Sequence, residues 1–500
     1  MDAFLAASPL LVVTVGALLL MLVEAFAKKG KPVDLALGTT VTFTAGALVA
    51  LGVWAAGPES LPGASMLEPY LLMDRFTLFF SFTICLAGAI TALLAGGYLR
   101  EHGLERGEFY PLLMLSAVGA MALAGAGDLL SVFLALETMS LGVYALCGFR
   151  RGSPRSVEAA IKYFLLGSLA AAFLLYGSAL LYGATGHTDL AGIGAAISAG
   201  TVAGKPVSMA LVVIALVLVL AGLVFKVSAV PFHMWTPDAY EGAPTPATTF
   251  MAVAVKSAAF AMMMRVLLLA FGDERAMSWE SGWPPVVAAL AVVTMTVGNL
   301  VAGRQESVKR MLAYSSIAHA GYVLIGMAAT MRQSGNEAEA SILYYLLAYT
   351  VSTAGAFGAL ILCGRRGAEA VSYEDLAGIG RRHPAAALAF TLFLLSLAGI
   401  PPTAGFFGKF YLFRAALYAG DGFVWLAIIG LLNSVIGAYY YLRVLVYMYM
   451  REPAPGAPIA TPMKSGYVAF ALVACAVLVI ALGVAPGTTI DLALLAPTRG

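Results

Sequence analysis

Apolar runs of about twenty residues recur along the whole chain, separated by short stretches that hold most of its charges. A helix needs roughly 20 apolar residues to cross the hydrocarbon core of a bilayer. On this rule the sequence predicts about fourteen spans. They begin near Ser8, Leu35, Leu71, Tyr110, Asp128, Arg155, Val207, Pro244, Pro284, Ser307, Ala338, Ala385, Phe423 and Ser465. We therefore expect an all-α polytopic membrane protein.

The composition excludes a soluble protein of this size. Of the 500 residues, 61% are hydrophobic and 11% are charged, which is too little charge to cover a soluble surface. The run near Ser8 lacks a basic leading segment and an obvious cleavage site, so we interpret it as a span and not as a signal peptide. The net charge of +2 says little, so the positions of the charges matter more than their sum.

The loop charges predict an orientation, because Lys and Arg accumulate in cytoplasmic loops. If the N-terminus lies outside, the cytoplasmic loops hold Lys28, Lys29, Lys31, Arg100, Arg106, Arg150, Arg151, Arg155, Arg304, Lys309, Arg310, Arg365, Arg366, Arg381, Arg382, Arg451 and Lys464. The outer side then holds only Arg75, Lys205, Arg275, Arg332 and Arg499. This asymmetry favours an even number of spans with both termini outside.

The cysteines and histidines give no signature of a metal or redox centre. Cys85, Cys147, Cys363 and Cys475 each lie alone inside an apolar segment, without a CxxC spacing. We interpret them as small buried hydrophobic residues. The five histidines are scattered, with no pair at i and i+4. We therefore predict no metal site and no redox cofactor on this chain.

Two predicted spans contain prolines that a continuous helix would not tolerate. Pro231 interrupts the seventh span shortly after Lys226, and Pro401 with Pro402 interrupts the twelfth shortly before Lys409. Irregular backbone at membrane depth is tolerated only where protein or a wet cavity satisfies it. Broken helices at matching positions of two halves are typical of inverted-repeat transporters.

The two broken spans are five apart in order, so they cross the membrane in opposite directions. We therefore predict two inverted five-helix repeats, made of spans 4–8 and 9–13. The predicted divisions are 1–109 for an N-terminal three-helix segment, 110–272 for the first repeat, 283–451 for the second repeat, and 452–500 for the fourteenth helix and tail.

Ionisable residues inside the spans are the candidate functional residues: Glu137, Lys162, Lys226, Lys256, His319 and Lys409. A charge near the bilayer centre costs at least about 2.5 kcal/mol and normally marks an ion pathway. The alternative is that some of them reach an interface or form a static pair, which applies most to Lys162, close to a predicted cytoplasmic loop. For His319 the alternative is a core histidine with satisfied hydrogen bonds.

A row of buried lysines favours protons over Na⁺ as the transported ion. Burial disfavours the charged form of a lysine, and a nearby carboxylate restores it. A buried lysine whose acidic partner approaches and withdraws can therefore take up and release a proton near neutral pH. Na⁺ sites, in contrast, usually use carboxylates and carbonyl oxygens.

Four motifs carry a resemblance to a known family: HMWTPDAYEGAPTP, KYFLLGS, LAYSSIAHAGY and GIPPTAGFFGKF. They resemble the subunit N family of bacterial complex I, the proton-pumping NADH:quinone oxidoreductase, and the resemblance covers nearly the whole chain. It implies fourteen helices with two inverted repeats, each with a broken helix, in a fold shared with Mrp-type cation/proton antiporters.

The resemblance also implies roles for single residues. Glu137 resembles the fifth-helix glutamate that pairs with the seventh-helix lysine, here Lys226. Lys256 resembles the central lysine of the eighth helix, and Lys409 the twelfth-helix lysine on the outward half-channel. Lys162 and His319 match positions that extend the polar axis. The helix break then lets water and a mobile carboxylate reach Lys226.

Lys409 and the end of the chain separate this sequence from its relatives. The M-type subunit is expected to have a glutamate at the position of Lys409, and the L-type subunit has a long C-terminal lateral helix for which this sequence has no room. YEGAPTP after WTPDA is also typical of subunit N.

By this resemblance the chain is a proton-translocating subunit in the bacterial inner membrane, with both termini periplasmic. NADH, FMN, Fe–S clusters and quinone are expected in partner subunits and not on this chain. The expected partners are M-type and small K- and J-type membrane subunits, the lateral helix of the L-type subunit and the lipid bilayer, but no nucleic acid.

Three alternatives stay open. The chain could be an Mrp-type Na⁺/H⁺ antiporter subunit, against which Lys409 and the GAPTP run argue. It could also be the equivalent subunit of a ferredoxin- or coenzyme F420-linked relative of complex I, or of the photosynthetic version, which the membrane arm alone separates poorly. A third alternative, an inactive assembly scaffold, would not explain why the costly buried charges are kept.

Overall fold

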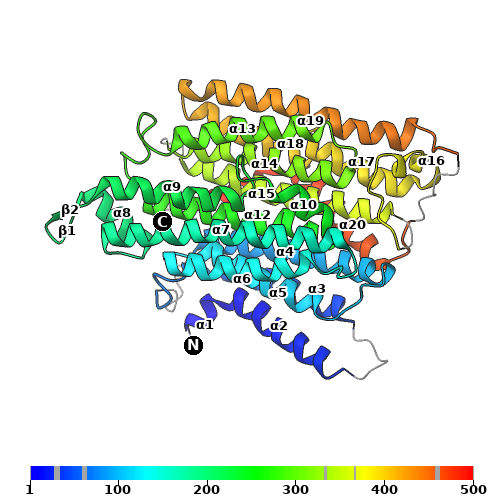
Figure 1. Cartoon of the computed structure of the whole chain (residues 1–500), viewed down its shortest axis with the longest axis horizontal. Coiled ribbons are helices and arrows are strands. Elements are labelled where there is room, and N and C mark those ends of the chain that lie inside the picture. The colour runs from blue at the N-terminus through cyan, green and yellow to red at the C-terminus, as the bar shows by residue number, and fades with distance from the viewer. Residues whose placement is uncertain are drawn as a thin grey trace.

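The long helices of this chain lie roughly parallel to one another and form one bundle (Figure 1). The computed structural model describes residues 2–27, 34–58, 65–331, 335–364, 367–455 and 462–498. The predicted loop cations that lie outside the described residues are Lys28, Lys29, Lys31, Arg332, Arg365, Arg366 and Arg499.

The N-terminal segment consists of four helices, of which the last is the most buried: α1 (Asp2–Ala6), α2 (Ser8–Ala25), α3 (Leu35–Ala56) and α4 (Arg75–Glu101). α1 and α2 lie at one edge of the bundle, and α3 packs against both α2 and α4 (Figure 1). α4 begins after Asp74, whose carboxylate accepts a hydrogen bond from the Thr77 backbone N–H at 2.9 Å. Such a cap satisfies a backbone donor that the first turn of a helix leaves free.

The next part of the chain contains a helix pair, a long helix, a short hairpin and the first broken span. These elements are α5 (Phe109–Gly125), α6 (Leu129–Cys147), α7 (Pro154–Thr185), α8 (Leu190–Ala199), β1 (Thr201–Val202), β2 (Lys205–Pro206), α9 (Met209–Lys226) and α10 (Trp235–Gly242). β1 and β2 pair antiparallel.

A single span over residues 245–270 follows and changes its helical form along its length. It consists of α11 (Thr245–Phe250), the π-helix η2 (Met251–Val255), α12 (Lys256–Arg265) and the π-helix η3 (Val266–Ala270). π-helical turns are rare and are frequently found at functional sites.

The remaining elements contain the second broken span. They are α13 (Pro284–Ala302), α14 (Val308–Ala329), α15 (Gly335–Leu362), η4 (Glu374–Leu376), α16 (Ile379–Arg382), α17 (Pro384–Ala398), α18 (Ala404–Tyr418), η5 (Asp421–Phe423), α19 (Val424–Met450), α20 (Gly466–Val484) and α21 (Pro486–Leu494).

Twelve helical stretches of the described chain are long and apolar enough to cross a membrane. α5 and α17 are apolar but shorter, with 17 and 15 residues. The structure is therefore nearly all helical, as the sequence predicts. The count of fourteen spans, the four divisions of the chain and the inverted repeats stay predictions.

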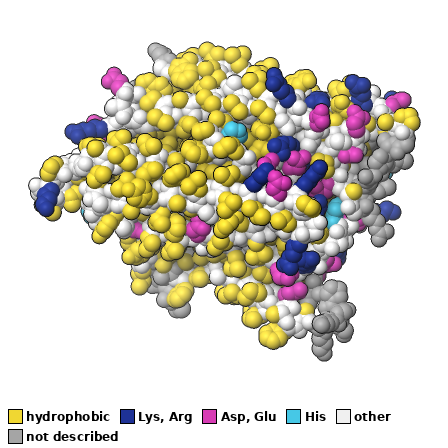
Figure 2. Space-filling view, in the orientation of Figure 1, with side chains coloured by type: hydrophobic (Ala, Val, Ile, Leu, Met, Phe, Trp, Pro, Cys, Tyr) yellow, Lys and Arg dark blue, Asp and Glu magenta, His cyan; other side chains and the backbone are white. Residues whose placement is uncertain are grey.

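Charged and apolar side chains occupy different parts of the surface. Charged side chains gather mainly toward the end of the bundle at which α10 and α16 lie, and hydrophobic side chains cover the flank (Figure 2). Leu134, Leu165 and Val217 are examples of large hydrophobic residues exposed on the outside. An apolar flank with charges at its end fits a protein surrounded by lipid.

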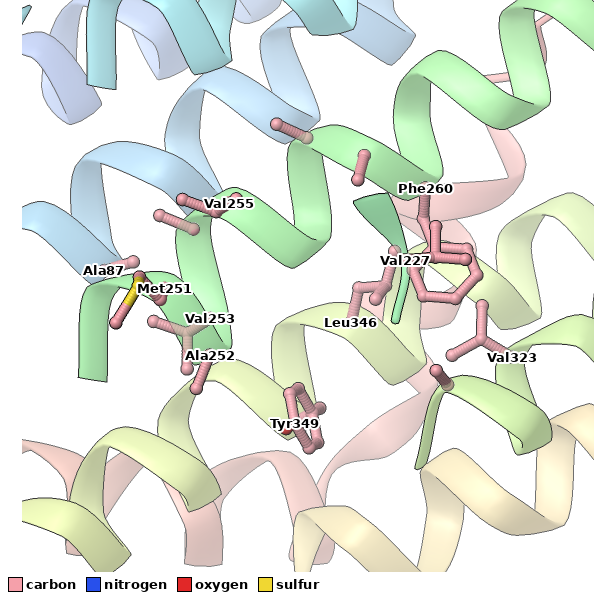
Figure 3. Packing of buried hydrophobic residues seen from close by; sticks show 14 of the residues in the cluster. Ala87, Val227, Met251, Ala252, Val253, Val255, Phe260, Val323, Leu346 and Tyr349 are labelled. Carbon is pink, nitrogen blue, oxygen red and sulfur yellow. The ribbon is translucent and has the colours of Figure 1, made fainter. Parts of the chain in front are cut away.

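The span 245–270 lies in the core of the bundle and is buried almost completely. Figure 3 shows Met251, Val253 and Phe260 of this span among side chains from other elements, including Ala87 of α4 and Leu346 of α15.

The four cysteines are also buried and free, which confirms their interpretation as small core residues.

One end of this span is fixed by a buried arginine. Arg265 is 1% exposed, and its Nη2 donates to both carboxylate oxygens of Asp74 at 2.5 and 2.6 Å. Its Nη2 also donates to Thr77 Oγ1 at 3.0 Å, and its guanidinium lies over the Phe76 ring at 4.5 Å. The carbonyl oxygen of Thr498 accepts from Nη1 at 3.4 Å, so the C-terminal tail contacts the same cation.

We predict that Arg265→Met destabilises the protein by about 1–3 kcal/mol, because the partly exposed Asp74 carboxylate loses its buried partner. Thermal unfolding of the purified protein in detergent measures this loss. Arg275→Met is the matched control, because Arg275 is exposed. Equal melting temperatures for the two variants would contradict the prediction.

Candidate functional site

Lys226 lies at the first helix break, where the sequence places it. It is the last residue of α9, and residues 227–234, which include Pro231, form turns before α10 begins. Trp235 Nε1 donates to the carbonyl oxygen of Phe225 at 3.1 Å and so satisfies one of the acceptors that the helix end leaves free. Lys226 itself is 2% exposed.

The ammonium group of Lys226 is held by neutral groups. Its Nζ donates to Ser140 Oγ at 2.7 Å and to Tyr144 Oη at 3.3 Å. The rings of Tyr144 and Tyr163 lie 5.4 and 5.9 Å from Nζ, within the range of cation–π attraction.

Glu137 does not contact Lys226 in this conformation. It lies on α6 one turn before Ser140, is partly buried, and its Oε1 has no hydrogen-bond partner. Ser140 therefore takes the place beside Lys226 that the family resemblance predicted for Glu137. Because residues three apart share a helix face, Glu137 and Ser140 project from the same side of α6.

Lys256 lies at the centre of the bundle and contacts α14. It is the first residue of α12, directly after the π-helix η2, and is 2% exposed. Its Nζ donates to the carbonyl oxygen of Ser316 at 2.6 Å and to Ser316 Oγ at 2.5 Å. A lysine and a hydroxyl are thus joined across two spans.

His319 continues this polar line one turn along α14. Its Nδ1 lies 2.5 Å from Tyr345 Oη and its Nε2 lies 3.0 Å from Tyr441 Oη. Tyr441 also bonds to the hydroxyl of Ser315. Beside His319 and Tyr345 lies a cavity of about 10 Å³ that reaches Ser396 and Gly405, and this volume suits one water molecule.

Lys409 lies beside the second helix break. Residues 399–403, which include Pro401 and Pro402, separate α17 from α18, and Lys409 lies on α18 with 6% exposure. Its Nζ donates to the carbonyl oxygen of Ala398, the last residue of α17, at 2.9 Å. It also donates to Ser434 Oγ of α19 at 2.8 Å.

The break requires a glycine next to Lys409. Gly399 has φ of +89°, a conformation that L side chains rarely adopt. A Cβ at this position would lie 3.1 Å from Cδ of Lys409, so the lysine side chain occupies space that any residue other than glycine would need here.

Lys162 is not buried in the chain, so the expectation of a buried charge at this position is wrong, and its role in the relay stays a prediction. Its side chain is 47% exposed and pairs with Glu158 at 2.6 Å and with Asp238 at 3.0 Å. The physical reason lies in the register of α7, because Ala159 and Tyr163 form its buried face and Lys162 points away from it. The cluster continues through Arg310, which pairs with Asp238 at 2.9 Å.

Two of the buried charges that the sequence analysis did not single out are Lys309 and Arg265, which lie near the ends of spans, where a charge is usually assigned to a loop. Lys309 was assigned to a cytoplasmic loop but is 1% exposed and pairs with Glu369 at 3.1 Å. Arg265 is buried equally. The apolar residues on both sides of Arg265, in MMMRVLLL, were a signal for burial that could have been used.

The proton-carrying candidates thus fall into clusters from different spans. Lys226 joins α9 to α6, Lys256 joins α12 to α14, and Lys409 joins α18 to α17 and α19. Within the described ranges, these three lysines form no ion pair with a carboxylate, and no direct hydrogen bond connects one lysine to the next. The same ranges contain no group of three or more His, Cys, Asp or Glu residues that could hold a metal ion.

Comparison with known proteins gives one family. Residues 126–437 match the family described as NADH:quinone oxidoreductase/Mrp antiporter, transmembrane. The chain is 68% identical over 499 residues to NADH-quinone oxidoreductase subunit N 1 of Sorangium cellulosum, an alignment that covers 98% of this chain and 97% of that protein.

Two solved structures contain chains with the same fold as this protein. A chain in the structure of respiratory complex I from Thermus thermophilus with bound aureothin is 35% identical, with a TM-score of 0.77, and the match covers 97% of this chain and 98% of that one. A chain of the Mrp complex from Dietzia sp. shares the fold, with a TM-score of 0.82 at 23% identity over 99% of this chain and 96% of that one. The motif resemblance is confirmed, and the chain belongs to the subunit N family of NADH-quinone oxidoreductases, antiporter-like membrane proteins.

Proposed function

We propose that this chain is the proton-translocating subunit N of a bacterial respiratory NADH:quinone oxidoreductase. The observation that carries the proposal is the set of three buried lysines held by neutral oxygens. Lys226, Lys256 and Lys409 donate to hydroxyl groups and backbone carbonyls. Because no fixed carboxylate holds the positive charge, each lysine can lose and regain its proton when its surroundings change.

The proposed path runs from the cytoplasmic side through Lys226 and Lys256 to Lys409 and the outer side. Approach of Glu137 to Lys226 would stabilise the charged lysine, and withdrawal to the arrangement described above would favour release of its proton. His319 and its tyrosines would extend the path from Ser316 toward the second break.

Redox chemistry would take place elsewhere in the complex. We propose that NADH, FMN, the Fe–S clusters and quinone are bound by partner subunits, and that their reaction reaches this chain through movement or electrostatics along the membrane. The two breaks, near Pro231 and near Pro401 and Pro402, support the division into inverted repeats over residues 110–272 and 283–451. We place both termini in the periplasm on the basis of the loop charges.

The exposed charges around Lys162 support a partner on this flank. Glu158, Lys162, Asp238, Glu241 and Arg310 form one network of ion pairs on α7, α10 and α14. We propose that it faces the lateral helix of an L-type subunit, and that M-type and small K- and J-type subunits cover other flanks. Lys162 would then act at a subunit contact and not as a relay residue.

A second candidate function is that of an Mrp-type cation/proton antiporter subunit, which the fold of the Dietzia chain favours. A subunit of a ferredoxin- or F420-linked relative of complex I is a third. Both would keep the buried lysines, so the electron donor separates them from the proposed function.

We predict that the chain, tagged and extracted in mild detergent, is purified together with flavin and Fe–S absorbance and with NADH:quinone activity. Visible spectra and NADH oxidation with a quinone acceptor measure this result. A colourless particle whose transport depends on Na⁺ would support the antiporter. A coloured particle inert to NADH but active with ferredoxin or F420 would identify another donor.

We predict that Lys226→Ala lowers NADH-driven proton pumping several-fold in a complex that assembles fully, because the first relay group is lost. Acidification of inverted membrane vesicles measures pumping, and native gels measure assembly. Lys205→Ala, which changes an exposed lysine of the β2 strand, is the matched control. Unchanged proton stoichiometry in the Lys226 variant would contradict its role.

We predict that Gly399→Ala lowers pumping although it removes no charged group. An alanine in the left-handed conformation costs about 1 kcal/mol, and its Cβ would push Lys409 from the Ala398 carbonyl. Gly466→Ala is the control, because a Cβ there meets no atom within 4 Å. Equal pumping by both variants would show that the position of Lys409 tolerates this displacement.

A further inference from the structure

A buried carboxylate in the loop after α15 joins elements from both halves of the chain. Oε1 of Glu369 accepts from Thr245 Oγ1 at 2.7 Å, and also from the hydroxyl of Tyr98. Arg150 Nη2 lies 3.4 Å from Oε1, and Lys309 Nζ donates to Oε2 at 3.1 Å. We call these five residues the Glu369 cluster.

The cluster lies at one end of the bundle. Tyr98 is near the end of α4, Arg150 follows α6, Thr245 begins the span 245–270, and Lys309 is the second residue of α14. This is the end to which the loop charges assign the cytoplasm. Lys309 also donates to the carbonyl oxygen of Ala243, so the cluster fixes the loop that leads into α11.

The charge balance of the cluster depends on Glu369. The side chains of Lys309 and Glu369 are 1% and 11% exposed, whereas that of Arg150 is 32% exposed. Burial alone raises the pKa of the Glu369 carboxyl, but Lys309, with help from Tyr98 and Arg150, lowers the pKa to about 2. Glu369 is therefore ionised near neutral pH, and its single negative charge lies beside the buried Lys309 and the partly exposed Arg150.

The cluster is separated from Lys256 by a short apolar stretch. Lys309 and Ser316 are seven residues apart on α14, which places them on the same face about 10 Å apart along the axis. Leu312 and Ala313 lie between them and are buried. Ser316 is the residue to which Lys256 donates, so only about two helical turns separate the cluster from the central lysine.

We propose that the Glu369 cluster is a seal that closes a direct water route from the cytoplasmic end of the bundle to Lys256. With the seal closed, protons reach Lys256 only by way of Lys226, which is what coupling to a mobile Glu137 requires. This inference rests on the proposed function, because a seal matters only in a proton-conducting subunit. Glu369 is then a positioning residue and does not itself carry protons.

The charge balance makes the seal testable. Glu369→Gln keeps the shape of the side chain but leaves the buried Lys309 without its counter-charge, so Lys309 keeps its proton only where water enters to solvate it. The expected result is a several-fold faster passive proton leak through the assembled complex. Lys309→Met combined with E369Q removes the uncompensated buried charge, so the double variant is expected to leak less than the single one.

The experiment uses the purified complex in liposomes with a trapped pH dye. A potassium diffusion potential, imposed with valinomycin and without NADH, drives the passive leak. Glu374→Gln is the matched control in the same loop, because Glu374 is exposed. If E369Q fails to assemble, Glu369→Asp keeps the charge but shortens its reach, and an intermediate leak is expected.

Two results would overturn the seal: equal leaks in E369Q and E374Q, or a double variant that leaks as fast as E369Q. NADH-driven pumping by the unchanged complex is measured first. A complex that does not pump overturns the proposed function, whereas a complex that pumps but shows no faster leak in E369Q overturns the seal alone.

Discussion

The span 245–270 is held by a buried ion cluster at each end, and the position of Lys256 depends on both. Thr245 at one end donates to Glu369, and Arg265 at the other donates to Asp74. At about 1.5 Å per residue, Lys256 lies about 16 Å from the first anchor and about 14 Å from the second. The π-helix η2 ends directly before Lys256, between the two anchors.

The anchors and the functional lysines use charge in opposite ways. Each anchor pairs a cation with a carboxylate, and removing one partner of such a pair destabilises the folded protein. Lys226 and Lys256 instead donate to hydroxyl groups and a carbonyl, which accept a hydrogen bond from either protonation state. The structural cations Arg265 and Lys309 are therefore paired with carboxylates, whereas the lysines proposed to change protonation state are not.

The sequence was sufficient for the helical fold, the two breaks and the burial of Lys226, Lys256 and Lys409, because each of these follows from local patterns of apolar residues and prolines. It failed at span ends, where the depth of one charge depends on neighbours far away in the chain. Lys309 is buried because Glu369, 60 residues later, folds back over it. Lys162 is exposed because the neighbouring Ala159 and Tyr163 form the packed face of α7. The burial of Lys309 therefore cannot be predicted from the residues next to it, whereas the exposure of Lys162 depends on which face of its own helix is packed.

The two helix breaks look alike in sequence but are satisfied differently. At the first break the indole of Trp235 bonds the carbonyl of Phe225, so Lys226 is free to contact Ser140 and can change partners without exposing the helix end. At the second break Lys409 itself bonds the carbonyl of Ala398, at the negative end of the α17 dipole. A proton on Lys409 therefore stabilises the end of α17, and loss of that proton weakens the contact. The protonation state of Lys409 is thus linked directly to the position of the α17 end. At the first break the helix end is held by Trp235 and not by Lys226, so the protonation state of Lys226 has no such direct link.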